Sequence, residues 1–359
     1  MVDAEKSPSQ ILLDWFDRNQ RHLPWRARTG KPINPYQVWL SEVMLQQTTV
    51  VTVKGYFEDF VNRWPTVNDL AAAELDSVLH AWQGLGYYAR ARNLHKCAKI
   101  VVACFGGTFP ESEAELLTLP GIGPYTAAAI AAIAFGKVTT PVDGNVERVM
   151  ARVHRISKPL SSVKDLLKAK ASVFTPIERC GDYAQAVMDL GATVCTPRKP
   201  TCALCPWSEI CAAYRAGDAE EFPKRILKKR KPTRYGVIFW LEDRRGRVLL
   251  RRRQEKGLLG GMMEFPSTDW VEGSWTGEDA TRGAPTKIDW HILSGTVRHT
   301  FTHFHLELTV FKGIADDEMA PEGVWSEVDQ LGDYALPTVM KKVSAYVSLG
   351  SPVKSILGR

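Results

Sequence analysis

Apolar residues recur at helical spacing along the first part of the chain. From Gln10 to Cys211 they stand at positions i, i+3 and i+4, and proline or glycine interrupts the pattern near positions 24, 65, 110, 120, 141, 159 and 176. Such a period places one apolar stripe along each of several helices. The pattern therefore predicts one large all-α region.

The pattern changes at Tyr235. Short runs of β-branched and aromatic residues follow, among them "RYGVIFWLED", "RVLLRRR", "GTVRHTF" and "HFHLELTVFKG", and turns such as "DRRGR" separate them. We predict a multi-domain chain: an all-α domain over residues 1–218, a basic linker over 219–234 and an α+β domain over 235–359. In the linker stretch "EFPKRILKKRKPTR", seven basic residues and two prolines indicate an extended segment, which is either merely solvated or in contact with phosphate.

Composition and charge narrow the class of protein. Of 359 residues, 45% are hydrophobic and 24% charged, as in ordinary globular proteins. The longest alanine-rich apolar stretch, residues 126–135, is about half of the roughly 20 residues that cross a bilayer, and no signal-peptide pattern is found. We expect a soluble, non-secreted, cytoplasmic monomer, associated with the nucleoid if the source is bacterial. The net charge of +6 favours a polyanionic partner.

Four of the seven cysteines lie in one short loop. Their spacing is Cys195-x6-Cys202-x2-Cys205-x5-Cys211, unlike the spread pairs of a secreted disulfide scaffold. Four thiolates this close can bind one Zn²⁺ or one [4Fe–4S] cluster. Structural zinc sites usually pair two C-x2-C knuckles, whereas this loop has one knuckle and two unequal arms. The spacing thus favours iron–sulfur and leaves zinc open.

The stretch "LPGIGPYTAAAI" at 119–130 is typical of a helix–hairpin–helix turn. Gly121 and Gly123 let backbone approach closely, and the free amides that begin the second helix can hold a nucleic-acid phosphate. Phosphate contacts of this kind position a duplex without reading its sequence. An ordinary turn between two helices is the alternative.

Two carboxylates stand near this turn or upstream of it. Glu42 lies in an otherwise apolar helical segment, where its pKa can be raised as a general acid requires; a solvated glutamate on a helix face is the alternative. Asp143 stands just before a helical run, so it is either only an N-cap or a carboxylate that stabilises a developing cation.

Taken in order, these motifs resemble one family. The succession S-E-V-M-L-Q-Q-T, G-L-G-Y-Y, L-P-G-x-G-x-Y-T, V-D-G-N-V and C-x6-C-x2-C-x5-C is similar to the helix–hairpin–helix DNA glycosylases, and among them to the adenine DNA glycosylase (MutY) family. The match runs from about residue 10 to 215. Further on, "KGLLGGMMEFP" and "RHTFTHFHLEL" resemble that family's Nudix-like C-terminal domain. The resemblance implies a [4Fe–4S] cluster on the four cysteines, with Arg198 and Lys199 facing the DNA backbone.

The resemblance also implies a reaction and its residues. The family hydrolyses the N-glycosidic bond of adenine mispaired with 8-oxoguanine or guanine, on a nucleotide flipped out of duplex DNA, in base excision repair. Glu42 matches the acid that protonates adenine, and Asp143 matches the carboxylate that stabilises or captures the oxocarbenium centre. Tyr125 matches the tyrosine beside that centre, and Asn145 the amide that orients the acid and the water.

One position separates this family from its strand-cutting relatives. In the endonuclease III branch the residue before the hairpin threonine is a lysine that forms a Schiff base, but here it is Tyr125. Residue 147, a lysine in some members, is Glu147. We therefore expect a monofunctional glycosylase without efficient lyase activity. A bifunctional lyase and a lesion-sensing protein without chemistry are the rival hypotheses, and the presence of both carboxylates disfavours the second.

Further matches concern DNA recognition. Trp25 and Arg26 match the lining of the adenine pocket and Gln185 the side chain that reads the base edge, although about four extra residues precede Pro35 relative to some members.

Other matched residues contact the double helix. Gln47 and Tyr87 match side chains that wedge into the base stack, and core packing is the alternative for Tyr87. Phe301-Thr302-His303 matches the Phe-Ser-His loop that recognises 8-oxoguanine, with an ordinary β-turn as the alternative. The C-terminal domain lacks the glutamate-dense helix of Nudix hydrolases, which favours a reader over a hydrolase.

Overall fold

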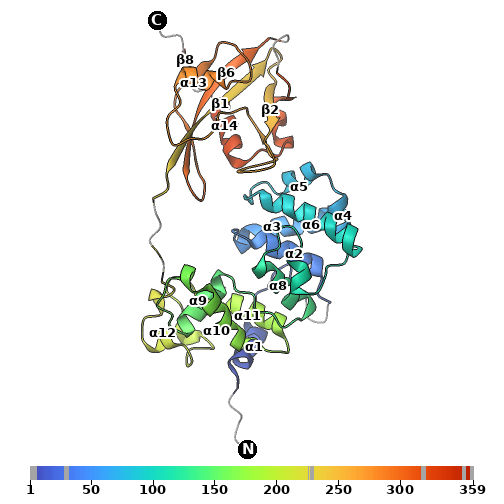
Figure 1. Cartoon of the computed structure of the whole chain (residues 1–359), viewed down its shortest axis with the longest axis vertical. Helices are drawn as coiled ribbons and strands as arrows, with labels where there is room; N and C mark the ends of the chain where they lie inside the picture. Colours follow the sequence, from blue (N-terminus) through green and yellow to red (C-terminus); the bar gives the residue numbers. More distant parts are fainter. Residues whose placement is uncertain are drawn as a thin grey trace, which may run out of the picture. The chain divides into compact units, whose positions relative to one another are not determined.

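The computed structural model describes residues 6–27, 32–224, 226, 230–316 and 321–349, and the backbone of 353–355. The chain divides into two compact units. One comprises Met1–Ala73 with Asn93–Leu227, and the other comprises Glu74–Arg92 with Lys228–Arg359 (Figure 1). Residues 225 and 227–229 of the predicted linker lie outside the described residues, and so do residues 28–31 in the segment between Arg26 and Pro35 where the extra residues are expected.

All regular elements among the described residues of the first unit are helices, which confirms the predicted all-α region. Its helices are α1 (Pro8–Asn19), α2 (Pro35–Leu45), α3 (Val50–Arg63), α4 (Val67–Ala72), most of α6 (Ala89–Phe105), α7 (Glu113–Leu116), α8 (Pro124–Phe135), α9 (Gly144–Val153), α10 (Lys164–Phe174), α11 (Cys180–Thr193) and α12 (Ala212–Arg215). Short 3-10 turns cover Leu160–Ser162, Cys202–Leu204 and Ala219–Glu221.

Local sequence sets the start of α2, the helix that carries Glu42. The side chain of Asn34 accepts hydrogen bonds from the backbone N–H groups of Tyr36 and Gln37, at 3.0 and 3.4 Å, and Pro35 occupies the first turn. An asparagine cap followed by proline is a strong helix start because the cap satisfies free amides and proline fixes φ. Helix α2 therefore begins at a defined residue.

Helix α8 is the centre of the first unit. It is apolar almost all round, every residue from Thr126 to Ile133 is buried, and it packs against α2, α7 and α11. A helix without a polar face is stable only when neighbours cover it on all sides. The α8 N-terminus, which follows the hairpin turn, is thus held rigidly among the helices that carry the site.

The hairpin turn before α8 needs a glycine at Gly121. Its φ is +79°, and a Cβ there would lie 2.8 Å from the Asn93 Cβ. Both the left-handed backbone and the close approach disfavour any residue with a Cβ. Gly123 is the N-cap of α8 and forms no side-chain cap, so the first amides of this helix are not satisfied by a side chain.

The second unit is an α+β fold, as predicted. The strands of its described residues form one eight-stranded sheet in the order β3-β2-β1-β6-β4-β8, with β5 paired to β6 and β7 paired to β2. Among these described strands, β1 and β6 pair in parallel and the other pairs are antiparallel. The elements are α5 (Leu75–Ala81), β1 (Thr233–Asp243), β2 (Val248–Arg252), β3 (Met263–Glu264), α13 (Gly277–Arg282), β4 (His291–Leu293), β5 (Val297–Thr300), β6 (His305–Ala315), β7 (Val324–Ser326), α14 (Thr338–Ser348) and β8 (Val353–Ser355).

Strand alternation builds a core on each face of this sheet. Along β1, Ile238 and Trp240 point into one core, whereas Val237, Phe239 and Leu241 point into the other. Helix α14 covers the first core and α13 contributes to the second. Because both faces are covered, β1 reads as a continuous apolar run and not as an alternating one.

Helix α5 and the turn after it group with the sheet because hydrogen bonds join them. His80 Nε2 lies 2.9 Å from the carbonyl oxygen of Gly332, and Gln83 Nε2 donates to the carbonyl oxygen of Tyr334 at 2.7 Å. The sequence places Glu74–Arg92 in the helical domain, whereas by its contacts this segment groups with the second unit. The predicted domain boundaries therefore stay a prediction.

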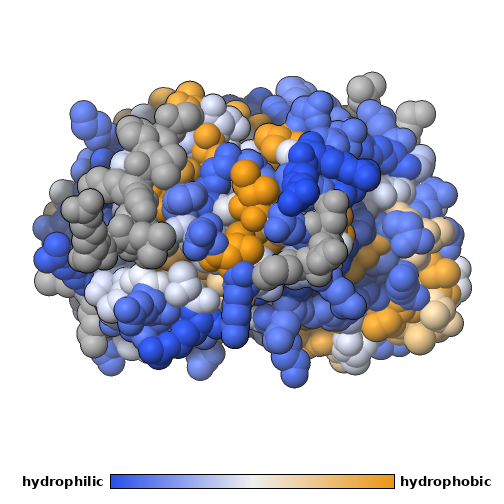
Figure 2. Space-filling model, turned by 90° about the horizontal axis from the view of Figure 1, so that it is seen from above, coloured by the Kyte–Doolittle hydropathy of each residue, from blue (hydrophilic) through white to orange (hydrophobic). Residues whose placement is uncertain are grey.

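None of the described helices is long and apolar enough to cross a membrane. On the face drawn in Figure 2, apolar side chains stand in small groups between hydrophilic ones.

Candidate active site and cysteine loop

Glu42 is buried on α2, with 7% of its surface exposed, so it is not a solvated residue on a helix face. Burial raises the pKa of Glu42 to about 7; a hydrogen bond from Tyr125 opposes the shift, the charge of Asp143 adds to it, and the charge of Arg26 opposes it. Burial of a carboxyl group disfavours the ionised form. Near neutral pH, Glu42 is therefore able both to hold a proton and to release it.

Asp143 is the N-cap of α9. Its Oδ1 accepts hydrogen bonds from the backbone N–H groups of Asn145 and Val146, at 2.9 and 2.8 Å, and its Oδ2 accepts one from Asn145 Nδ2 at 2.9 Å. An ionised carboxylate is a pure acceptor, and both oxygens of Asp143 accept hydrogen bonds from these three N–H donors. The cap geometry predicted for Asp143 is thus present, and it leaves the charge of Asp143 close enough to act on Glu42.

Tyr125 is the second residue of α8, and the charges of Glu42 and Asp143 both act on it. Burial raises its pKa well above the usual value, and the charges of Glu42 and Asp143 raise it further. Its hydroxyl oxygen lies 3.8 Å from Met188 Sδ. A neutral phenol, and no amine, therefore occupies this position.

A narrow cavity of about 50 Å³ opens beside Glu42. Trp25, Arg26, Glu42 and Gln185, all predicted site residues, line it, and Arg21, Ser41 and apolar side chains complete its wall. A cavity of this volume can hold water molecules.

The sequence interpretation missed the residue that holds Arg26 in place. Asp189 on α11 is fully buried and accepts hydrogen bonds from Nη1 and Nη2 of Arg26, at 2.7 and 2.8 Å. Arg21 Nε also donates a hydrogen bond to Asp189 Oδ1 at 2.6 Å. Burial acts to raise the pKa of Asp189, but the hydrogen bonds and charges of the two arginines outweigh it and hold that pKa below the usual range. A lone acid in the apolar run "AVMDLG" was the available signal.

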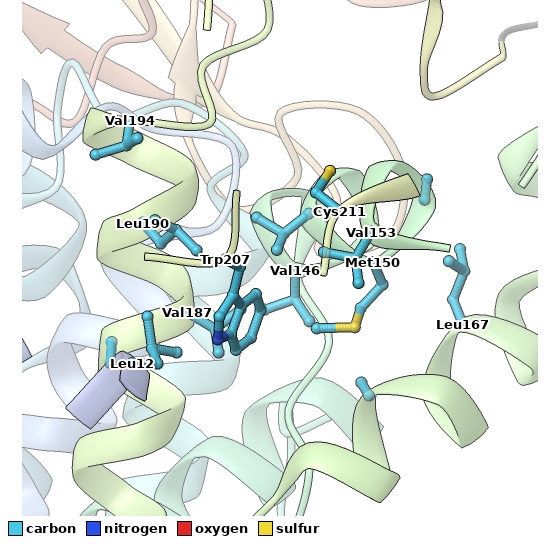
Figure 3. Close-up of a cluster of buried hydrophobic side chains, with 14 of the residues drawn as sticks. Leu12, Val146, Met150, Val153, Leu167, Val187, Leu190, Val194, Trp207 and Cys211 are labelled. Carbon is cyan, nitrogen blue, oxygen red and sulfur yellow. The ribbon is translucent and has the colours of Figure 1, made fainter. Parts of the chain in front are cut away.

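The four predicted cysteine ligands line one small cavity of about 20 Å³, together with Arg152 and Trp207. Trp207 anchors the loop, because its Nε1 donates to the carbonyl oxygen of Pro8 at 2.8 Å. Figure 3 shows how the loop joins the apolar core: Trp207 and Cys211 lie among side chains of α9 and α11, including Val146, Met150, Val153, Val187 and Leu190.

The donor set of this loop fits an iron–sulfur cluster. Burial raises the pKa of Cys205 to about 12, so free thiolates are unfavourable there unless metal cations compensate them. Among the described residues, no three His, Cys, Asp or Glu side chains could share one metal ion. Four cysteine side chains around one cavity can supply one thiolate to each iron of a cluster.

Two buried arginines of α9, also missed from sequence, hold the cysteine loop, and one of them also contacts the Asp143 cap. Arg148 donates to Asn145 Oδ1 at 2.7 Å and to the carbonyl oxygen of Cys195 at 2.8 Å. Arg152 donates to Cys195 Sγ at 3.2 Å. The close packing behind them depends on Gly191, where a Cβ would lie 2.6 Å from the Asn145 Cβ.

The two predicted wedge residues share an unusual backbone. Gln47 has φ +60° and Tyr87 has φ +47°, a left-handed conformation that costs non-glycine residues free energy. Both side chains are exposed, and Tyr87 is 46% exposed, so core packing is not its role. The predicted Arg198 and Lys199 are exposed as well.

The loop Phe301–His303 is the turn between β5 and β6. Phe301 N donates to the carbonyl oxygen of Phe304 at 2.9 Å, and the Phe301 ring stacks on Trp270 at 5.8 Å. Thr302 and His303 are exposed, and the hydroxyl of Thr302 is hydrogen-bonded to that of Tyr87 in the same unit. Contacts with Phe304 and Trp270 therefore hold Phe301 in place, whereas Thr302 and His303 are exposed.

Comparison with known proteins agrees with this architecture. Residues 40–172 match the family model of the HhH-GPD superfamily base excision DNA repair protein, and residues 237–346 match that of the NUDIX domain. The solved structure of a thermostable thymine-DNA glycosylase is 29% identical, covers 58% of this chain and 95% of its own, and superposes with a TM-score of 0.52.

Curated relatives cover both units. The adenine DNA glycosylase of Homo sapiens is 36% identical over 394 residues, which is 92% of this chain and 72% of the human one. That of Buchnera aphidicola subsp. Schizaphis graminum is 32% identical over 360 residues, 93% of this chain and 97% of the other. Fold and site thus define a base excision repair glycosylase of the helix–hairpin–helix class. The chain belongs to the adenine DNA glycosylase family.

These comparisons confirm the predicted family, fold class and enzyme class, an adenine-specific DNA N-glycosylase. The roles of the individual site residues and the predicted domain boundaries stay predictions.

Proposed function

We propose that this chain is a monofunctional adenine DNA glycosylase that removes adenine opposite 8-oxoguanine or guanine from double-stranded DNA during base excision repair. One observation carries the proposal: two carboxyl groups near each other have opposite environments. Glu42 is buried with a pKa near 7, and Asp143 is held by three N–H donors at a helix N-terminus. Carboxyl groups separated in this way take acid and charge-stabilising roles.

The proposed reaction begins with proton transfer. Glu42 donates its proton to a ring nitrogen of the flipped adenine, so that the electrons of the breaking bond between C1′ and N9 pass into a neutral leaving base. Asp143 stabilises or transiently captures the oxocarbenium-like sugar that remains. Water then adds to C1′ and passes a proton to a carboxylate, which yields an abasic site. Asn145 holds Asp143 in position through the 2.9 Å hydrogen bond from its side chain.

Tyr125 supports the absence of efficient strand cleavage. A lyase of this fold class needs an amine that forms a Schiff base with C1′, and a phenol cannot supply one. Glu147 adds no amine nearby, since it is a carboxyl group whose pKa burial raises. Strand breaks are therefore expected only after treatment with alkali.

The cavity beside Glu42 is the proposed base pocket. Trp25 supplies an aromatic wall, with 8% of its surface exposed, and its ring packs edge-on against Phe57 at 5.5 Å. Arg26 and Gln185 supply polar edges, and Asp189 positions Arg26. Hydrogen-bonding groups in a pocket discriminate bases strongly because a mismatched base leaves them unpaired.

Phosphate contacts and wedges are the proposed means of base flipping. The open amides at the α8 N-terminus, after Gly121 and Gly123, suit a backbone phosphate. The exposed Gln47 and Tyr87 suit insertion into the base stack, and unstacking costs a few kcal/mol that such contacts offset. Phe301, Thr302 and His303 are proposed to read 8-oxoguanine in the opposite strand, with the threonine methyl as a departure from the family pattern.

A [4Fe–4S] cluster on Cys195, Cys202, Cys205 and Cys211 is the proposed cofactor. When bound, it supplies iron–thiolate bonds that fix the loop and takes no part in bond cleavage. The exposed Arg198 and Lys199 lie within this loop, which suits contact with the DNA backbone.

The deciding experiment measures adenine release from duplexes with adenine opposite 8-oxoguanine, guanine or thymine, with and without alkali. We expect release opposite 8-oxoguanine and guanine, and breaks only after alkali. Glu42→Gln and Asp143→Asn each remove one carboxyl group at nearly constant size, and both should abolish release while DNA binding persists. Borohydride trapping distinguishes the lyase rival: a covalent adduct at the yield of a true lyase contradicts the proposal. No release from any duplex by cluster-loaded protein leaves only a DNA-binding function.

A further inference from the structure

Three consecutive arginines stand where the chain leaves the sheet: Arg251 and Arg252 end strand β2, and Arg253 follows it. In the structure they line a groove of about 660 Å³ on the second unit. Arg234 at the start of β1 and Lys256 in the loop after β2 join them. Five cations from separate segments thus converge on one concave surface.

The groove keeps an excess of positive charge. Its described lining residues include two carboxyl groups, Glu264 and Asp269, so five cations against two acids leave three in excess. Glu264, 2% exposed, binds Arg251 at 2.9 Å and also Arg253, and it holds both guanidinium groups in place.

The remaining three cations among the described residues of the groove form no ion pair with Glu264. Arg252 pairs with Asp76 of α5 at 2.7 Å, with 46% of the arginine side chain exposed. Among the residues that the structure describes, Arg234 and Lys256 form no ion pair. Partly fixed arginines together with exposed cations are suited to anionic oxygen atoms.

The groove offers charge but little to hold a nucleobase. The aromatic ring among its described lining residues, Trp270, is already engaged: the Phe301 ring stacks on it at 5.8 Å and the Arg253 guanidinium lies over it at 5.1 Å. Binding of single bases or free nucleotides usually relies on an available aromatic face. Phosphate groups need no such face.

The groove also adjoins the Phe301–His303 loop. Trp270 is both its wall and the stacking partner of Phe301. Arg234 lies over the Phe304 ring at 4.6 Å, and Lys231 Nζ donates to the carbonyl oxygen of Phe301 at 3.0 Å. Two cations therefore lie at the base of the loop that is proposed to read the lesion.

We propose that this groove binds backbone phosphates of the DNA strand whose base meets the Phe301–His303 loop. The inference rests on the proposed function, since it takes the partner to be duplex DNA. The groove contributes affinity and register without reading sequence, and the loop contributes recognition.

The test compares the salt dependence of binding for two matched double variants. The duplex carries a tetrahydrofuran abasic analogue opposite 8-oxoguanine, so that no turnover occurs. Arg252→Gln/Lys256→Gln removes two groove charges. Arg244→Gln/Arg282→Gln removes two exposed charges outside the groove, at sites whose side chains are 67% and 78% exposed.

The groove variant should bind about tenfold more weakly at low salt, and its slope of log K against log salt should be shallower by about 2, close to 0.9 for each lost phosphate contact. The control should keep the wild-type slope. Equal slopes for the two variants would overturn the proposal. A neutral methylphosphonate at a contacted phosphate near 8-oxoguanine should weaken the wild-type protein and leave the groove variant little changed.

Competition with a free nucleotide tests whether the groove is a nucleotide site. If dGTP at millimolar concentration displaces DNA from the wild type through the groove and fails to do so with the groove variant, the groove binds nucleotides and the proposal is wrong. Single-turnover adenine release at saturating enzyme should be unchanged in the groove variant, which also shows that it folds. Absence of release from every form contradicts the proposed function, while the binding slopes still decide the groove.

Discussion

The proton on Glu42 gives the sharpest quantitative test of the mechanism. Its pKa is about 7, against an ordinary value of 4.5, because burial disfavours the carboxylate. With one titrating group, about 90% of the molecules carry the proton at pH 6 and about 10% at pH 8. If Glu42 is the general acid, the single-turnover rate under subsaturating enzyme should therefore fall about tenfold for each pH unit above 7.

The same shift predicts a change in stability with a definite sign. A carboxyl group whose folded-state pKa is raised contributes its full stability below the unfolded value of 4.5, and this contribution is lost as pH rises through about 7. The difference of about 2.5 pKa units amounts to about 3 kcal/mol. Glu42→Gln removes the titration, so the variant should gain up to about 3 kcal/mol over the wild type between pH 4.5 and pH 8.

Two assays check this reasoning. Denaturant unfolding of the wild type and Glu42→Gln at pH 5, 6, 7 and 8 measures the stability difference, and rapid-quench adenine release from pH 5 to 9 measures the rate. Glu58→Gln, at a glutamate on the open surface beside Lys54, controls for loss of a carboxyl group in general. A stability difference that does not change with pH, or a rate that stays flat across pH 7, would refute the assignment of a buried, proton-carrying Glu42.

Three further predictions follow from single contacts. Asp189→Asn breaks the buried pair with Arg26 and should cost about 3–5 kcal/mol of stability in a denaturant titration, with adenine release slowed more than DNA binding is weakened. Gly121→Ala should destabilise by about 1–3 kcal/mol because φ is +79° and its Cβ meets Asn93, whereas Gly136→Ala, with φ +64° and open space, should cost less; thermal melts compare the two. Cys211→Ser should lower the iron content of purified protein and speed limited proteolysis within residues 195–211; full iron content in this variant would contradict its role as a ligand.

Much of the protein was determined by local sequence. Helical spacing up to Cys211 and β-rich runs from Tyr235 gave the two fold classes, because burial period and turn residues act over a few positions. The L-P-G-x-G turn and the cysteine spacing are equally local, since a tight turn or a loop ligand set constrains neighbouring residues directly.

Tertiary structure decided what those residues experience. A pKa near 7 for Glu42 depends on desolvation by helices far away in sequence, and no local pattern reports that burial. Asp189 became visible as a positioning residue only when α11 brought it to Arg26, 163 positions away in the chain. The phosphate groove likewise unites β1, β2 and the Trp270 segment. Sequence alone thus determined the motifs and their order, whereas long-range packing determined the charge state, pairing and convergence on which the chemistry depends.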